Sequence, residues 1–222
     1  MNPTRLLPLL FLFLGSLFAT AQFPDRLLID KEEHAIFCNP LDQFFAKNPE
    51  RRPKSEGMCT ALWRGYIGVF VIKDKQLSVS DVLVLNPNSN ALDFVSRMGD
   101  SFPLGTDRTL TWFTGLLVLP QGEQLEYVHM GYASLYERYR LIHIKAGKVV
   151  ADRTFTSDEY REYRLLQWEE YKKTQDYKTM LADLKKREPS ELEAEKFLAI
   201  YSVNFQSDIA LDYKDFTPSK AK

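Results

Sequence analysis

The sequence predicts an α+β protein in which an antiparallel, strongly twisted sheet or partly open β-barrel is followed by a C-terminal helical hairpin. Three observations lead to this class. Short apolar runs separated by turn residues follow one another over residues 27–155. No helix-length pattern separates these runs, which argues against a parallel sheet of βαβ units. After residue 155 the chain becomes rich in charge and almost free of Gly and Pro, as expected of helices.

The first half of the β region pairs apolar runs around short polar turns. Residues 27–29 and 35–37 predict a hairpin that turns at 30–33, and residues 40–46 predict a short helix. A longer β pattern covers residues 60–72, where both faces are apolar or aromatic, as in a central or strongly curved strand. The return strand is expected at 77–85, after a turn at 73–76.

The second half of the β region begins after a loop. Residues 86–108 contain Pro87, Pro103 and three asparagines, which predicts irregular structure. The β pattern then resumes. Strands are expected at 109–119, 125–130, 137–145 and 149–155, with turns at 120–123 and 146–148 and a further turn at 131–134.

Two capping boxes predict the helical extension. Thr156-Ser157-Asp158-Glu159 opens a helix that is expected to continue to about Arg187, before Pro189 ends it. Residues 190–193 form the second capping box and open another helix. We therefore expect an antiparallel β domain at residues 22–155 and a C-terminal helical extension at 156–222.

The first twenty-one residues predict a signal peptide. Arg5 precedes an apolar run over residues 6–14, and Ala19-Thr20-Ala21 has the small-residue pattern of a cleavage site. Residues 1–21 would be removed by a cut between Ala21 and Gln22, which places the mature protein in the periplasm or outside the cell. No later run is apolar enough to cross a bilayer, so the mature chain is expected to have no membrane span.

Charge and cysteine content narrow the chemistry further. Lys and Arg total 29 against 30 Asp and Glu, a balance that argues against nucleic acid as the main partner. Cys38 and Cys59 are the only cysteines, and in an oxidising compartment they predict a disulfide that closes a proline-rich loop. The alternative is a pair of buried thiols.

Three unusual segments carry a family resemblance. They cover residues 60–66 (TALWRGY), 112–122 (WFTGLLVLPQG) and 127–137 (YVHMGYASLYE). In this order they resemble a family of small uncharacterised bacterial proteins with A-L-W-R-G-Y, F-[ST]-G-x-L-x-[IL]-P-Q-G and L-x-Y-V-H-M-G-Y-x-S-x-Y-E motifs. The resemblance covers residues 27–150 and implies no assigned activity. The export signal and the helical extension are additions to the compact unit of that family.

The same segments contain the densest group of polar and aromatic residues. Arg64 is the most unusual of them, because an arginine on an apolar strand must face solvent, a ligand or an acidic partner. Its guanidinium could hold a carboxylate or a phosphate, or it could pair structurally with Glu126 or Glu137. The predicted ligand-binding residues are Arg64, Tyr66, Tyr127 and His129.

A catalytic site is the alternative interpretation. His129 can act as a general acid or base near neutral pH, and the candidates to work with it are Glu126, Glu137 and Tyr132. The histidines are too widely spaced in sequence to predict a metal site, and phosphate-binding glycine loops are absent, so no metal or cofactor is expected.

The sequence thus favours an exported binding or structural module of the cell envelope over an enzyme. The expected partner is an unidentified small molecule or an envelope protein. The competing hypothesis is an exported hydrolase that uses His129 with a nearby Glu or Tyr.

Overall fold

The computed structural model describes residues 21–55, 59–89, 91–129, 131–186 and 190–201. The predicted signal peptide, apart from Ala21, and residues 202–222 of the predicted helical extension lie outside this part of the chain. The elements run in the order β1 (Asp25–Ile29), β2 (Glu32–Ile36), α1 (Asp42–Lys47), β3 (Ile67–Lys73), β4 (Gln76–Leu85), β5 (Phe94–Ser96), α2 (Met98–Ser101), β6 (Gly115–Glu126), β7 (Leu135–Lys145), β8 (Lys148–Thr156), α3 (Ser157–Tyr171), α4 (Gln175–Lys185) and α5 (Glu191–Tyr201).

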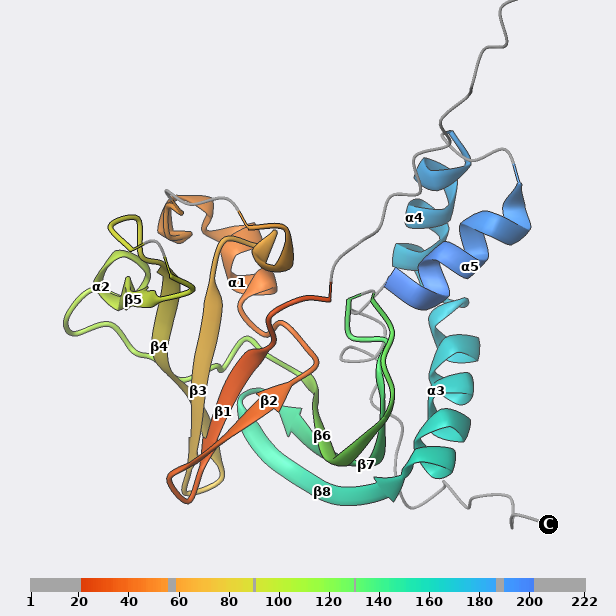
Figure 1. Cartoon of the computed structure of the whole chain (residues 1–222), viewed down its shortest axis with the longest axis horizontal. Coiled ribbons are helices and arrows are strands. Elements are labelled where there is room, and N and C mark those ends of the chain that lie inside the picture. Colours follow the sequence, from red (N-terminus) through yellow and green to blue (C-terminus); the bar gives the residue numbers. More distant parts are fainter. Residues whose placement is uncertain (1–20, 56–58, 90, 130, 187–189, 202–222) are drawn as a thin grey trace, which may run out of the picture.

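The strands form an open, twisted sheet, which confirms the predicted α+β class. The strand order is β2-β1-β3-β4-β8-β7-β6, and β5 pairs with the outer part of β4. Figure 1 shows how strongly β6, β7 and β8 curve away from the β1–β4 half. The two halves meet only narrowly, through Gln76 and Lys148 in the β4–β8 pair. At the other end, the amide of Phe37 donates to the carbonyl of Val118 at 2.8 Å, yet the sheet stays open.

One strand pair differs from the predicted antiparallel pattern. Strands β1 and β3 run parallel, with Arg26 opposite Val69 and Leu28 opposite Val71. Parallel strands need a long crossover, and here the connection passes through β2, α1 and the segment before β3. The sheet is therefore mixed.

Three two-residue turns join the hairpins where the sequence predicts them. Asp30-Lys31, Asp74-Lys75 and Ala146-Gly147 link β1 to β2, β3 to β4 and β7 to β8. All six residues have positive φ, between 47° and 76°. This is the geometry of type I′ turns, whose twist matches that of the flanking strands.

Two predicted β segments take another form. Residues 60–62 form a 3-10 turn, so the strand expected from Thr60 begins only at Ile67. The turn expected at 120–123 is absent, and β6 continues through it as one strand. Gly122 has a φ of 79° and lies where the β6–β7 register shifts, so the Gln-Gly pair forms a bulge instead of reversing the chain.

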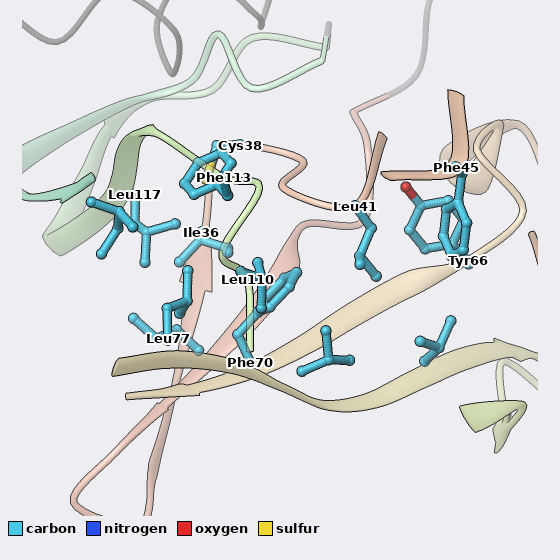
Figure 2. Close-up of a cluster of buried hydrophobic side chains, with 14 of the residues drawn as sticks. Ile36, Cys38, Leu41, Phe45, Tyr66, Phe70, Leu77, Leu110, Phe113 and Leu117 are labelled. Carbon is cyan, nitrogen blue, oxygen red and sulfur yellow. The ribbon is translucent and has the colours of Figure 1, made fainter. Parts of the chain in front are cut away.

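The core occupies both faces of the curved sheet. The larger cluster fills the concave side, where Ile36, Leu41, Phe70, Phe113 and Leu117 are fully or almost fully buried. Figure 2 shows these side chains converging from β2, the following segment, β3, β6 and the loop before β6. The smaller cluster lies beneath α3, where Tyr139, Phe155, Tyr160 and Tyr163 pack beside Phe37, Leu116, Val118 and Leu141.

The helical extension starts as predicted but contains an additional break. Thr156 and Glu159 form the expected capping box at the start of α3. The helix ends at Tyr171, because the hydroxyl of Thr174 accepts from the amide of Tyr177 and caps a new helix. Residues 157–185 therefore form two helices, α3 and α4, instead of the one expected. No helix in the described ranges is long and apolar enough to cross a membrane.

Gly147 provides a test of the turn geometry. We predict that Gly147→Ala lowers the free energy of unfolding by on the order of 2 kcal/mol, measured by urea denaturation. Its φ is 76°, and an added Cβ would lie 2.8 Å from the carbonyl oxygen of Leu110. Gly99→Ala is the control, since nothing lies within 4 Å of a Cβ there. Equal losses in both variants would contradict the turn assignment.

Candidate functional site

Arg64 lies inside the protein, between the 3-10 turn and β3, and forms a buried ion pair. Its side chain is 2% exposed and that of its partner Asp25 is fully buried. The Nη2 of Arg64 is 3.0 Å from Asp25 Oδ1 and also lies within hydrogen-bond distance of the Phe23 carbonyl and the Tyr132 hydroxyl. The amide of Gly68 donates to the same Asp25 oxygen at 2.8 Å. The pair thus joins β1 to β3 and to the segment after β6.

Two tyrosines extend this pair into a network. The Tyr66 ring lies 5.2 Å from the Arg64 guanidinium, and its hydroxyl donates to Asp42 of α1 at 2.6 Å. The Tyr132 hydroxyl donates to Asn39 at 3.0 Å. We call Asp25, Asn39, Asp42, Arg64, Tyr66 and Tyr132 the Arg64 network.

Burial dominates the electrostatics of the network. Desolvation raises the pKa of the Asp25 carboxyl above its ordinary value, although the Arg64 guanidinium and the Gly68 amide oppose the shift. Burial is the largest single effect on Arg64 and lowers its pKa, but Asp25, Tyr132 and Tyr66 together outweigh it, so the pKa of Arg64 is also raised. Asp25 Oδ2 and Arg64 Nη1 are buried without a hydrogen-bond partner in the described chain. Burying the pair therefore costs free energy. Removing one partner alone is expected to destabilise the fold further, because it leaves a buried charge unpaired.

The predicted residues Tyr127 and His129 lie outside the Arg64 network, on an exposed loop. We call residues 127–129 and 131–134, which join β6 to β7, the hairpin tip. The Tyr127 hydroxyl and Nδ1 of His129 are 2.7 Å apart, and Tyr127 is 59% exposed. The Ser134 hydroxyl holds the tip by bonding both the amide and the carbonyl of Val128. Local hydrogen bonds thus order an exposed polar-aromatic surface.

Gln22 connects the hairpin tip to Trp63, the neighbour of Arg64. The Gln22 amide donates to the carbonyl of Gly131 at 3.2 Å, and its side chain accepts from the Trp63 amide at 3.4 Å. Its Nε2 donates to the carbonyl of Thr60 at 2.9 Å. The Trp63 side chain is 70% exposed. Gln22 thus links the backbone at Trp63 to the hairpin tip, which carries Tyr127 and His129, and we call these three exposed side chains the aromatic patch.

The predicted catalytic groups make separate contacts. His129 bonds Tyr127, Tyr132 bonds the Arg64 network, and Glu137 accepts from the amide of Glu123 at 3.2 Å. Glu126 is the last residue of β6, and its side chain is exposed. No hydrogen bond or ion pair in the described residues joins His129 to Glu126, Glu137 or Tyr132. Nor does the described chain contain a cluster of three or more His, Cys, Asp or Glu able to hold a metal ion.

The predicted disulfide is not present in the structure. Cys38 and Cys59 are not bonded to each other. Cys38 directly follows β2 and is buried in the concave core, near Phe113 in Figure 2. Cys59 is only half-buried, at the start of the 3-10 turn. Cys38 thus packs as a small apolar side chain in the core.

Sequence reasoning missed the acidic partner of Arg64. It offered Glu126 or Glu137, whereas the structure places Asp25 there. One weak sequence signal was available, because two-residue spacing places Asp25 on the strand face of the apolar Leu27. The structure buries both side chains. Comparisons of the chain with protein-family models, curated proteins and solved structures find no match. The family resemblance therefore stays a prediction.

The buried ion pair predicts a specific pattern of mutant stabilities. Arg64→Met should lower the free energy of unfolding by about 3–5 kcal/mol, because it leaves the Asp25 carboxylate unpaired. The double variant Arg64→Met/Asp25→Asn should be more stable than Arg64→Met alone, since the buried charge is removed. Urea denaturation of the wild type and the three variants measures the coupling. A double variant whose loss equals the sum of the single losses would contradict the pairing.

The same variant should show a characteristic pH dependence. Without Arg64, the folded-state pKa of Asp25 rises further above its unfolded value, so the folded state binds the extra proton. The contribution of the protonated Asp25 carboxyl to the stability of the variant is then fully present at acid pH. It is lost as the pH rises through the folded-state pKa. The deficit of Arg64→Met relative to wild type should shrink as the pH is lowered from neutral toward the ordinary titration range of a carboxyl. A deficit that is constant over this range would contradict the burial of an unpaired carboxylate.

Proposed function

We propose that this protein is an exported binding module of the cell envelope and that the aromatic patch is its contact surface for another envelope protein. The observation that carries the proposal is the exposure of Trp63 and Tyr127 beside a rigid buried network. Tryptophan and tyrosine dominate the energetics of protein interfaces, because they bury a large area with few rotatable bonds.

The Arg64 network has a supporting role in this proposal. Arg64 and Tyr66 are buried, so they position the patch and do not themselves contact the partner. Arg64 directly follows Trp63 of the patch in the chain, and Tyr132 anchors the end of the hairpin tip. A surface held from beneath in this way loses little conformational entropy on binding.

The binding role is favoured over the hydrolase because no acidic side chain among the described residues orients His129. A general base needs its substrate or orienting partner within hydrogen-bond reach. The contact that the described residues make with the His129 ring is the hydroxyl of Tyr127, on an exposed surface. Such a pair is suited to contacting a partner and lacks the enclosed environment that acid–base catalysis uses.

Site-specific photocrosslinking tests the contact surface. We predict that a photoreactive phenylalanine analogue at position 63 or 127 forms the same discrete adduct in intact cells. The matched control is position 104, because Leu104 is 99% exposed in the segment after α2 and is not part of the patch. Adducts that are absent, or equally strong from position 104, would contradict a dedicated surface.

The export step has its own test. The proposal predicts a mature chain that begins at Gln22, recovered in the periplasmic or extracellular fraction. Intact-mass measurement of the protein purified from each fraction reads the N-terminus directly. Recovery of an intact chain that starts at Met1 in the cytoplasm would overturn export while leaving the surface test unaffected.

A further inference from the structure

A second surface lies on the concave side of the sheet and shares no residue with the aromatic patch. A cavity of about 440 Å³ opens between the β1–β2 and β3–β4 hairpin ends on one side and β7 and β8 on the other. It lies beside the short β4–β8 pair, at the end of the sheet opposite the Phe37–Val118 hydrogen bond. We call it the concave groove. Its volume is in the range of small-molecule sites.

The floor of the concave groove is apolar and continuous with the core. Ile29, Ile72 and Val149 line it and pack against the concave core cluster, and Ile142 of the same lining is almost fully buried. The four side chains come from β1, β3, β7 and β8. Because they belong to regular strands, the floor is preformed and suits the apolar body of a ligand.

The rim of the concave groove carries two charges of each sign. Arg140 and Asp152 form a two-pronged ion pair across β7 and β8, with nitrogen–oxygen distances of 2.9 and 2.7 Å. Asp30 and Lys75 also line the groove. Both are exposed, and neither has an ion-pair partner within the described chain. Asp30 lies near enough to Arg140 to raise the pKa of the guanidinium, after the larger contribution of the Asp152 hydrogen bonds.

The two unpaired charges are placed by the backbone itself. Asp30 and Lys75 each occupy a type I′ turn, with φ of 51° and 61°. Asn and Gly are the residues that such turns favour, and a lysine there is conformationally unfavourable. The turns therefore hold an acidic and a basic side chain at the mouth of an apolar groove.

We propose that the concave groove binds a small zwitterion with an apolar side chain, that is, a free apolar amino acid or a dipeptide. The ligand ammonium would meet Asp30, its carboxylate would meet Lys75, and its side chain would lie on Ile29, Ile72 and Ile142. The Arg140–Asp152 pair already satisfies its own charges and forms one wall. This arrangement discriminates against ligands that carry only one of the two charges, because an unpaired rim charge would gain nothing.

Isothermal titration calorimetry of the full mature chain tests the proposal with four probes. L-leucine and L-leucyl-L-leucine carry both charges, 4-methylpentanoate lacks the ammonium, and 3-methylbutylamine lacks the carboxylate. We expect saturable binding of at least one of the first two probes and at least about tenfold weaker binding of the last two. Equal binding of all four probes would overturn the charge assignment, and no binding of either zwitterion would overturn the site.

The turn geometry supplies variants that do not compromise folding. Asp30→Asn and Lys75→Asn each remove one rim charge while placing a favoured residue in a type I′ turn. Each should weaken binding of the zwitterion by at least about tenfold without lowering the melting temperature. Lys31→Asn and Asp74→Asn are the matched controls, because these turn neighbours do not line the groove. Unchanged affinity in Asp30→Asn and Lys75→Asn would overturn the proposal, as would equal losses in the controls.

Discussion

The buried ion pair between Arg64 and Asp25 is the interaction on which the arrangement of the sheet and the hairpin tip depends. One carboxylate oxygen of Asp25 accepts from both the Arg64 guanidinium and the amide of Gly68. It thereby sets the position of β1 beside β3, the one parallel pair in the described sheet. Buried pairs often contribute little net stability, because desolvation offsets the attraction. The main effect of this pair is to specify that β1 packs beside β3 and beside the segment after β6.

Gly68 shows how closely the backbone is adapted to the pair. A Cβ at this position would lie 3.2 Å from Asp25 Oδ2 and 2.9 Å from the Phe70 ring. The glycine lets the strand approach the carboxylate, while Tyr66 and Tyr132 connect the pair to α1 and to the segment before it. A cluster of polar groups thus orders segments that the hydrophobic core alone would leave free to shift, since apolar contacts are not directional.

The open sheet separates two surfaces of different character. Because β4 pairs with β8 only at Gln76 and Lys148, the concave groove stays accessible at one end. The hairpin tip lies at the far end of β6 and β7, where the Arg64 network holds it. A closed barrel would fill the groove with side chains and would leave the tip alone exposed. Curvature without closure is therefore what allows two separate contact regions.

The sequence by itself determined the local features. The positions of the three hairpin turns, the Thr156 capping box and most strands follow from short polar turns between apolar runs and from short-range hydrogen bonds, which involve residues near in the chain. Only the tertiary structure decided that Asp25 pairs with Arg64, that β1 runs parallel to β3 and that Cys38 lies in the core. The reason is that partners 39 residues apart are chosen by burial and by mutual hydrogen bonding, which no local pattern encodes.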